Sequence, residues 1–508
     1  MQLPNCGYFN VMRLPILRQI EKSDWMFLKK WLGIAFILHV IAALLSSGFY
    51  HTDEHFQILE FVAYKLGRTS PSDLAIEFGY SMRPWLLPSI YYGLIRAFQG
   101  LRILSPFAWA TCFRVLSAII GWATLVGMAL LSFRWVPNRV FREWVIRLSA
   151  LLWFLPALHA RLSSENLGGS IFLAGFLLLF LSVENDRDPP SWKTCLGAGL
   201  LWGAAFEFRY QVGFMILGAS LWLLIFARVG FKQILAALTG IMILVGLGTA
   251  ADTWGYGHSS FAPWNYIQFN LIQGHVSDVD TSPWWDYFRR AFTETWPPLG
   301  LIVFCAFPIA WIRKPKHPLT WALVPFFLIH ELIGHKELRF LFPIALASPM
   351  LFIFAIESSF VLKSRFIRTI GFLLLFMNGV ALLTLTFTPA WMPIRFYEHV
   401  YAEANAGRLT TMAHVGDNPY LILGIPLGFY KAENLKLERF ESLEDFAKKL
   451  DHHSARFLFQ THASLPAQAN LLESRCRPAY SVLPTWVHRF NYYGVMDRVT
   501  NWTVFECN

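Results

Sequence analysis

The sequence predicts an all-α membrane protein that crosses the bilayer many times. Of its 508 residues, 55% are hydrophobic and 17% aromatic, while only 15% are charged. Soluble domains carry about 25% charged residues, so this composition excludes an ordinary soluble protein. Apolar runs close to the ~20 residues that cross a bilayer recur from residue 31 to residue 387.

About eleven of these apolar runs are candidate transmembrane helices. In chain order they are Trp31–Phe49, Phe107–Ser132, Trp144–His159, Leu167–Val183, Cys195–Phe208, Val212–Ala227, Ile234–Ala251, Pro298–Ile312, Leu319–Leu332, Leu338–Ile356 and Ile370–Phe387. The first run is long enough to stay as an anchor, and the polar segment before it lacks the pattern of a cleavable signal peptide.

Basic residues at the ends of these runs predict the orientation. An N-terminus in the cytoplasm places the following residues on the inner side, as the positive-inside rule expects: Lys29, Lys30, Arg134, Arg139, Arg142, Arg187, Lys193, Arg228, Lys232, Arg313, Lys314, Lys316, Lys363, Arg365 and Arg368. The net charge of +10 therefore indicates membrane orientation, and we expect no nucleic-acid partner. This assignment requires Arg83–Gln99 to be an interfacial helix, which Trp85, Tyr91 and Tyr92 favour.

The predicted outer side carries the first outer loop and a C-terminal domain. We expect a membrane catalytic domain over residues 1–388 and a small outer domain of mixed α/β structure over residues 389–508. In this second domain, Ser442–Leu450 opens with a possible capping box and indicates a short amphipathic helix. An oxidising compartment would allow Cys476 and Cys507 to pair, and two free thiols are the alternative.

Two adjacent carboxylates, Asp53 and Glu54, follow the first run. A hydroxyl group has a pKa far above neutral, so a reaction in which it attacks an electrophile needs a carboxylate that takes the proton. We expect Asp53 to be this base, while Glu54 would align the acceptor or hold a basic residue. The alternative is an ordinary helix N-cap followed by an acid that suits the helix dipole.

Two histidine pairs suggest metal ligation only weakly. His51 and His55 are four residues apart, which would allow one helix face to hold a metal, but capping and interfacial packing explain them as well. His330 and His335 flank a stretch similar to the H-E-x-x-H motif of zinc proteases. That stretch is one residue too long, because residues five apart on a helix point roughly 140° away from each other. We expect no metal and no cofactor.

A cationic motif, His335-Lys336-Glu337-Leu338-Arg339, lies on the same predicted face as Asp53. His335, Lys336 and Arg339 suit a phosphate group, which the planar fork of an arginine can orient. Alternatively, Lys336 and Arg339 snorkel at the bilayer edge and pair with Glu337.

Two other outer span ends carry further candidates. Arg209 lies at one of them and is a weaker candidate for the phosphate site. Arg161–Asn166 lies at another, where it would close the pocket through an Arg–Glu pair, cap the next helix, or do both.

Together these motifs resemble glycosyltransferase family 22, the family of GPI and lipid-linked-oligosaccharide mannosyltransferases. The resemblance spans Trp31 to about Pro343. Besides the two charged motifs it rests on Glu77, Arg83-Pro84, Arg161–Glu165, Arg209, Asp252–Gly257, Asn265, Phe269-Asn270 and Pro283–Phe288. Asn501–Cys507 is similar to the tail of the GPI enzyme that adds the third mannose. Thr52 stands where the commoner pattern has Pro, and Leu338 where it often has Glu or Tyr.

The resemblance implies a GT-C fold with a large first outer loop that contains interfacial helices. It also implies an inverting, metal-independent transfer of mannose from a polyprenyl-phosphate donor, typically dolichyl-phosphate-mannose, to a mannose-containing glycolipid. Catalysis would take place on the luminal face of the ER membrane in a eukaryote, or the periplasmic face of the inner membrane in a bacterium. The candidate sugar- or acceptor-binding residues are His51, His55, Gln57, Arg83, Asp252, Tyr256, Asn270, Trp285, Tyr287 and Glu337.

Three other functions fit parts of the sequence. A GT-C transferase of another sugar would share every motif. A lipid or sugar transporter would share the spans, but transporters tend to have internal repeats and charges near the midplane, whereas these charges lie at span ends. A membrane zinc protease fits least. For Trp284, Trp285 and Tyr287, stacking on a sugar competes with membership of an interfacial aromatic belt.

Overall fold

The computed structural model describes residues 14–275, 281–357, 365–450, 456–462, 472, 475–484, 487 and 500–508. The chain forms two compact units. The first consists of Met1–Leu45, Tyr80–Leu87 and Phe113–Phe387, and the second of Ser46–Gly79, Pro88–Cys112 and Thr388–Asn508. The second unit therefore joins the C-terminal segment to the first outer segment, which the predicted boundary after residue 388 separated.

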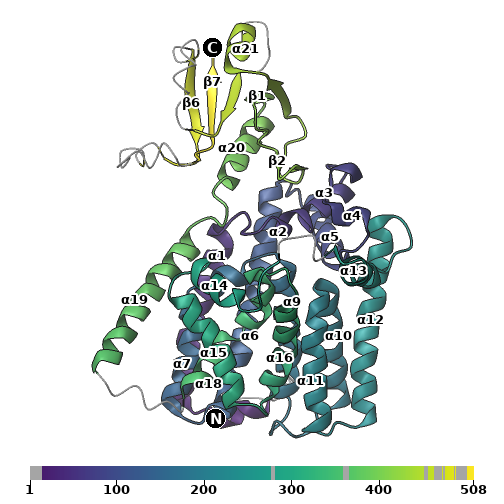
Figure 1. The fold of residues 1–508 in the computed structure, drawn as a ribbon, viewed down its shortest axis with the longest axis vertical. Helices are drawn as coiled ribbons and strands as arrows, with labels where there is room; N and C mark the ends of the chain where they lie inside the picture. The colour runs from purple at the N-terminus through teal and green to yellow at the C-terminus, as the bar shows by residue number, and fades with distance from the viewer. Residues whose placement is uncertain are drawn as a thin grey trace, which may run out of the picture. The chain divides into compact units, whose positions relative to one another are not determined.

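Helices build the first unit (Figure 1). They are α1 Lys22–Leu45, α6 Pro106–Trp135 (most of it), α7 Arg139–Leu151, α8 Leu155–His159, α9 Ser164–Leu181, α10 Trp192–Phe208, α11 Gly213–Ile225, α12 Phe231–Tyr256, α13 Ala262–Ile267, α14 Asp286–Thr293, α15 Leu299–Arg313, α16 Pro318–Leu332, α17 Phe342–Ala345, α18 Ser348–Ile356 and α19 Arg365–Phe387. Short 3-10 segments lie at Pro15–Gln19, Tyr210–Val212 and Leu338–Leu341, and Gln268–Ile272 is π-helical.

Each predicted apolar run is helical, but the expected number of about eleven continuous spans is not confirmed. Within the described residues, five helices are long and apolar enough to cross a membrane, or six if one bent pair counts as a span. Three shorter apolar stretches, Tyr210–Ile225, Leu299–Arg313 and Pro318–Leu332, are helical as well. The predicted run Trp144–His159 is broken into α7 and α8, and the run Leu338–Ile356 is bent by 76°.

The break between α7 and α8 is bridged by a polar side chain. Asn378 of α19 donates from Nδ2 to the carbonyl of Leu151 at 2.7 Å and accepts from the backbone N–H of Trp153 at 3.2 Å. Pro156 lies in the first turn of α8 and cannot donate to the preceding helix. In an apolar environment the interrupted backbone needs such partners, so Asn378 makes the break tolerable.

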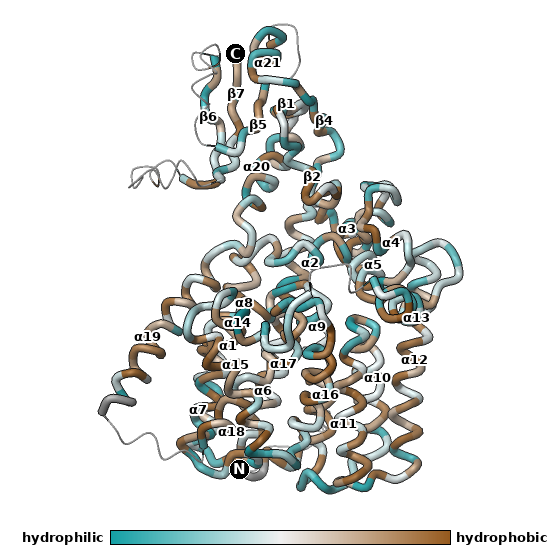
Figure 2. The backbone as a smooth tube through the Cα atoms, viewed as in Figure 1, coloured by the Kyte–Doolittle hydropathy of each residue, from teal (hydrophilic) through white to brown (hydrophobic). Residues whose placement is uncertain are grey.

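Two long helices expose apolar surface that the protein does not cover. Only 11% of the most apolar 18-residue window of α12 and 17% of that of α19 is buried. Figure 2 shows that hydrophobic residues dominate both helices. Because a soluble protein rarely leaves such surfaces bare, we assign both to lipid contact, as in an integral membrane protein.

Small residues let α10 and α12 pack side by side (Figure 1). A Cβ atom at Gly199 would lie 2.2 Å from the carbonyl oxygen of Ala237, and one at Gly240 would lie 2.6 Å from that of Leu196. Close backbone approach of this kind is common between membrane helices. Next to this pair, Trp202 stacks on Phe172 within the main hydrophobic core.

The second unit contains short helices and a mixed sheet. Its helices are α2 Asp53–Phe56, α3 Leu59–Lys65, α4 Ile76–Gly79, most of α5 Leu86–Gly100, α20 Ile394–Asn405 and α21 Leu443–Lys449, with a 3-10 turn at Pro71–Asp73. Its strands are β1 Thr411–Val415, β2 Leu421–Ile422, β3 Ile425–Pro426, β4 Lys436–Phe440, β5 Phe457–Gln460, β6 Cys476–Ser481 and β7 Thr503–Cys507. The mixed α/β character predicted for the C-terminal segment is confirmed.

The main sheet has five strands in the order β4-β1-β5-β7-β6. β1 pairs in parallel with β4 and β5, while β7 pairs antiparallel with β5 and β6. The predicted cap is present: the Ser442 side chain accepts from the backbone N–H of Asp445 at the start of α21. Phe446 of this helix packs with Leu458 and Phe505 in a small core.

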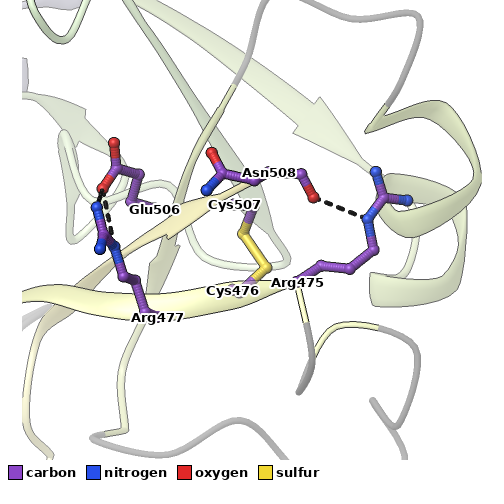
Figure 3. The surroundings of a disulfide bond; sticks show 6 residues. All are labelled: Arg475, Cys476, Arg477, Glu506, Cys507 and Asn508. Atoms are coloured by element: carbon purple, nitrogen blue, oxygen red, sulfur yellow. Dashed lines mark hydrogen bonds and ion pairs between the residues drawn. A yellow bond between two sulfur atoms is a disulfide. The ribbon is translucent and has the colours of Figure 1, made fainter.

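A disulfide joins the last two strands (Figure 3). Cys476 of β6 and Cys507 of β7 are directly paired in the ladder, with their Cα atoms 4.0 Å apart. Arg477 and Glu506 form an ion pair beside it at 2.8 Å. The pairing of Cys476 with Cys507 that the sequence allowed is thus present.

Candidate functional site

The cationic motif after α16 forms a hydrogen-bonded group in the first unit. Arg339, in the 3-10 turn Leu338–Leu341, donates from Nε and Nη2 to the two carboxylate oxygens of Glu337 at 2.5 and 3.2 Å. His335 Nε2 lies 2.9 Å from Oε1 of the same carboxylate. Glu337 therefore holds the histidine and the arginine of the motif together.

Two charged residues from α9 and the end of α10 join this group. Glu165 lies in the first turn of α9, which Ser163 caps by accepting from the N–H of Asn166. Its Oε1 lies 3.2 Å from Arg209 Nη1 and 3.4 Å from Arg339 Nη1. One buried carboxylate thus bridges two arginines that are distant in sequence. We call Glu165, Arg209, His335, Glu337 and Arg339 the arginine cluster.

The local backbone explains why Arg209 reaches Glu165. Arg209 has extended backbone angles (φ −150°, ψ 104°), so α10 ends there. Gly168 of α9 permits the approach, because a Cβ atom at this position would lie only 2.9 Å from Arg209 Cβ. A glycine on α9 therefore allows α9 and the end of α10 to bring their charges together.

An aromatic ring supports both guanidinium groups. The Cζ atoms of Arg209 and Arg339 lie 5.3 and 5.2 Å from the centre of the Phe340 ring. The His335 ring meets the same ring edge-on, at 5.7 Å between centroids. Cation–π contacts of this kind are strengthened where water is excluded, so Phe340 helps to fix the direction of both arginines.

The arginine cluster has the chemistry of a site for a phosphate group. Guanidinium groups have five N–H donors in a planar fork that matches phosphate oxygens, and the Glu165 contact uses one donor of Arg209. Two carboxylates nearly balance the two arginines. This balance limits the attraction for a resting anion, so the donors gain most from charge that develops during a reaction.

Lys336 is hydrogen-bonded to the backbone at the end of α16. Its Nζ donates to the backbone carbonyls of His330, Glu331 and Ile333 at 3.3, 2.9 and 2.6 Å, and the side chain is 1% exposed. An ammonium has three donors, and in this arrangement all three are used. Burial lowers the pKa of Lys336. Lys336 therefore orders the end of α16, and its contact with a phosphate stays a prediction.

The two adjacent carboxylates lie in the second unit, in the single turn α2. The side chain of Asp53 is 26% exposed and lies 3.7 Å from His51 Nδ1, while Glu54 is only 5% exposed. The alternative prediction made Asp53 the N-cap of a helix. In the structure Thr52 occupies the N-cap position, without a side-chain cap bond, and Asp53 is the first residue of α2. The two acids therefore have different surroundings, and Asp53 is the more accessible one.

The neighbours of these acids make contacts within the second unit. His55 is buried, with Nε2 2.7 Å from Glu60 Oε1. Gln57 donates from Nε2 to Glu77 at 2.9 Å. His55 is thus hydrogen-bonded to a carboxylate of the same unit, and Gln57 to another.

The C-terminal end of α12 holds the segment before α5. Asp252 accepts from the backbone N–H groups of Trp85 and Ala262 at 2.8 and 3.2 Å, and it is fully buried. One turn later, the Tyr256 hydroxyl donates to the carbonyl of Arg83 and accepts from its N–H, at 2.7 and 3.0 Å. Asp252 therefore fixes the backbone of Trp85 and Ala262, and Tyr256 fixes that of Arg83, while their contacts with a sugar stay a prediction.

The predicted aromatic residues divide into exposed and buried ones. Trp284 and Trp285 are 68% and 48% exposed, whereas Tyr287 is fully buried with the Lys336 ammonium 5.4 Å from its ring centre. Asn270 donates from its side chain to the carbonyl of Tyr266. The tryptophans remain candidates for sugar stacking, but Tyr287 does not have an accessible ring.

The protease-like stretch shows no ligand set. His330 is buried and its Nδ1 lies 2.7 Å from the carbonyl oxygen of Phe326, while His335 belongs to the arginine cluster. Among the residues that the structure describes, no group of three His, Cys, Asp or Glu side chains is placed to hold a metal ion.

The structure thus brings together Arg209, His335, Glu337 and Arg339, but the turn with Asp53 belongs to the other unit. Its approach to the arginine cluster stays a prediction. Glu165, which belongs to the arginine cluster, and Phe340, whose ring supports its two arginines, were not among the predicted site residues. Both residues lie in or next to stretches on which the family resemblance rests. A carboxylate is not an expected ligand of a phosphate, and a single Phe is usually part of a hydrophobic core, so neither was predicted to belong to the site.

Comparison with known proteins gives a consistent result. The model of the Alg9-like mannosyltransferase family matches residues 30–415. GPI mannosyltransferase 3 of Candida albicans is 26% identical over 366 residues, which cover 70% of this chain and 69% of that protein. Mannosyltransferase APTG1 of Arabidopsis thaliana is 25% identical over 309 residues, which cover 60% of this chain and 54% of that protein. The chain thus spans about half the length of the plant relative.

A solved structure shares the fold. ArnT from Cupriavidus metallidurans in its apo state matches with a TM-score of 0.53 at 12% identity, over 95% of this chain and 98% of that chain. The same protein bound to undecaprenyl phosphate gives a TM-score of 0.50. At such low identity the likeness concerns the fold alone, and it supports the GT-C architecture that the sequence motifs implied.

Proposed function

The chain belongs to the Alg9-like mannosyltransferase family, and from this premise we propose that it moves mannose from a polyprenyl-phosphate-mannose donor to a mannose-containing glycolipid. One observation carries the proposal most strongly. Arg209 and Arg339, both on the ring of Phe340 and bridged by Glu165, form a buried group of planar donors for the phosphate that leaves the sugar.

The proposed reaction is a single displacement. The oxygen of an acceptor hydroxyl attacks C1 of the mannose, the C1–O bond to the lipid phosphate breaks, and the configuration at C1 inverts. The hydroxyl proton goes to Asp53, and the electron pair leaves with the phosphate. The arginine cluster stabilises that phosphate more as its charge grows, so the step needs no divalent ion.

Exposure supports Asp53 as the base. A base must reach its proton within hydrogen-bond distance, and the Asp53 side chain is 26% exposed while Glu54 is 5% exposed. Glu54 is then an aligning residue. The exposed rings of Trp284 and Trp285 are our candidates to stack on sugar faces. Arg83, whose backbone is bonded to the Tyr256 hydroxyl, is a further candidate to bind the acceptor.

The relatives and the disulfide support a proposal for the acceptor and the compartment. The matched curated proteins include several named GPI mannosyltransferase 3, so we propose a GPI-precursor-like acceptor, with a lipid-linked oligosaccharide as the second choice. The disulfide Cys476–Cys507 supports an oxidising compartment for the second unit, which is the ER lumen in a eukaryote.

Sugar transfer by the purified chain in lipid nanodiscs tests the proposal. We expect a radiolabelled mannose to move from dolichyl-phosphate-mannose to a mannosylated glycolipid in excess EDTA, with the glucosyl donor at least tenfold slower. Asp53→Asn should reduce turnover by about 10³-fold, and Glu54→Gln by less, because general-base catalysis contributes about 10²–10⁴-fold. Transfer of glucose but not mannose, loss of activity in EDTA, or a fully active Asp53→Asn protein would contradict it.

A further inference from the structure

Glu60 is a fully buried carboxylate that joins three segments of the second unit. It lies in α3, and its Oε1 is 2.7 Å from Nε2 of His55 in α2. The same oxygen accepts from the backbone N–H of Phe429 at 2.9 Å, and Oε2 accepts from the Thr69 hydroxyl at 2.9 Å. Glu60 is 0% exposed. A buried carboxylate is tolerated only when its oxygens have such partners.

The helical turn that carries Asp53 depends on contacts from outside. α2 contains four residues, Asp53–Phe56, and a helix this short is not stable by itself. His55, two residues after Asp53, is its buried anchor: it bonds to Glu60 and stacks on Tyr430 with 5.3 Å between ring centres and 22° between planes. The position of Asp53 therefore follows from the position of the His55 ring.

Residues of the C-terminal segment contact the same His55 and Glu60 side chains. Tyr430, which stacks on His55, also stacks on Phe107 at 4.6 Å, and Arg68 donates to the carbonyl of Phe429 at 3.3 Å. Gly428 lies so close to the outer loop that a Cβ atom there would meet Thr69 Oγ1 at 2.2 Å. Residues Gly428–Tyr430 are thus fitted against α2 and α3.

We propose that Glu60 is a positioning residue for the proton acceptor: through His55 it holds the Asp53 turn against the Gly428–Tyr430 segment. The C-terminal segment then contributes to catalysis by fixing the position of the turn that carries Asp53. This inference rests on the proposed function, in which Asp53 receives the proton of the acceptor hydroxyl. A displacement of about 1 Å at such a group can lower a rate about 100-fold.

Two substitutions at Glu60 separate positioning from simple folding. Glu60→Gln keeps a side-chain oxygen that accepts from His55 and Phe429, and its amide can donate to Thr69, which also accepts. Glu60→Ala removes all three bonds. We expect kcat to fall about 100-fold in Glu60→Ala and less than about fivefold in Glu60→Gln, with the donor KM within about twofold of wild type in both. Ser442→Ala, which removes the cap of α21 in the same unit, should leave kcat unchanged.

Hydrogen exchange tests the same idea without using activity. In the full-length protein in nanodiscs, amides of residues 51–58 and 427–431 should exchange at least tenfold faster in Glu60→Ala than in wild type and near the wild-type rate in Glu60→Gln. Ser442→Ala should not change either peptide. This readout stands even if the transferred sugar proves not to be mannose. Wild-type exchange in Glu60→Ala, equal kcat losses in the Gln and Ala variants, or a matching loss in Ser442→Ala would overturn the proposal.

Discussion

At the scale of single residues, Arg339 and Lys336 show how neighbouring cations acquire different tasks. The sequence placed both in one phosphate-binding motif, and the spacing correctly suggested a group containing His335, Glu337 and Arg339. The motif did not indicate that the Lys336 ammonium donates to three backbone carbonyls at the end of α16. That direction depends on where the helix ends, which composition and motif spacing do not specify.

Substitution of Arg339 should therefore lower mainly kcat, and substitution of Lys336 mainly the stability of the protein. Arg339→Lys keeps the charge but loses the fork that Glu337 and Glu165 hold, so we expect kcat to fall about 10–100-fold, since hydrogen bonds to charged groups are worth about 1.5–3 kcal/mol. Lys336→Met leaves three carbonyls without a donor and should instead lower the thermal midpoint by several degrees. Steady-state kinetics and thermal unfolding of both proteins measure this contrast. Equal effects on kcat would contradict the assignment.

Asn501 belongs to a glycosylation motif, but its side chain is buried in the folded protein. Asn501-Trp502-Thr503 is a glycosylation sequon, but Asn501 is 1% exposed, donates to Ser481 Oγ at 2.8 Å and accepts from the N–H of Leu483 at 3.0 Å. A glycan would be attached to the amide nitrogen, which is buried and donates to Ser481, so it would disrupt that bond and could not be accommodated at this position. We expect the protein from a eukaryotic host to keep its mobility after endoglycosidase treatment, and Asn501→Ala to destabilise the unit by about 1–3 kcal/mol. A treated protein that migrates faster would refute this.

At the scale of helices and strands, composition predicted where apolar segments lie but not where they break. Runs such as Trp144–His159 were read as single spans because average hydropathy does not register a missing hydrogen bond. The break depends on Pro156 and on Asn378, a polar residue more than two hundred positions later that satisfies the open backbone. A pattern confined to one segment cannot reveal a partner in another. The strand order of the C-terminal sheet was beyond reach for the same reason.

This reading predicts a clear effect of removing the Asn378 side chain. Asn378→Leu keeps the apolar character of α19 but leaves the carbonyl of Leu151 and the N–H of Trp153 without their partner, at a cost of about 1–3 kcal/mol for each group. Thr384→Val, which removes a hydroxyl bonded within the same helix, is the matched control. Thermal unfolding in nanodiscs should show a lower midpoint for Asn378→Leu alone. Similar midpoints for the two variants would mean that the bridge contributes little.

At the scale of the whole molecule, the two units divide the proposed chemistry between them. The arginines proposed to bind the phosphate belong to the helical unit, and the turn proposed to accept the proton belongs to the unit with the sheet. Each motif could therefore be recognised from its own stretch of sequence, whereas the approach of Asp53 to the arginine cluster remains a prediction. It also makes one topology necessary: the first outer loop and the disulfide-bonded sheet must lie on the same side of the membrane, opposite the basic loops.

Side-specific labelling of single cysteines tests this topology. With the four cysteines outside the Cys476–Cys507 disulfide replaced by Ser, Ser72→Cys places an exposed thiol in the first outer loop, and Glu184→Cys places one between α9 and α10. In sealed ER-derived vesicles with the cytoplasmic side outward, a membrane-impermeant maleimide should label Glu184→Cys at once and Ser72→Cys only after detergent. This difference in labelling is expected because the positive-inside rule places the basic loops on the cytoplasmic side. Labelling of Ser72→Cys in intact vesicles would put Asp53 on the side away from the lumen, where the proposed lipid-linked acceptor is not expected.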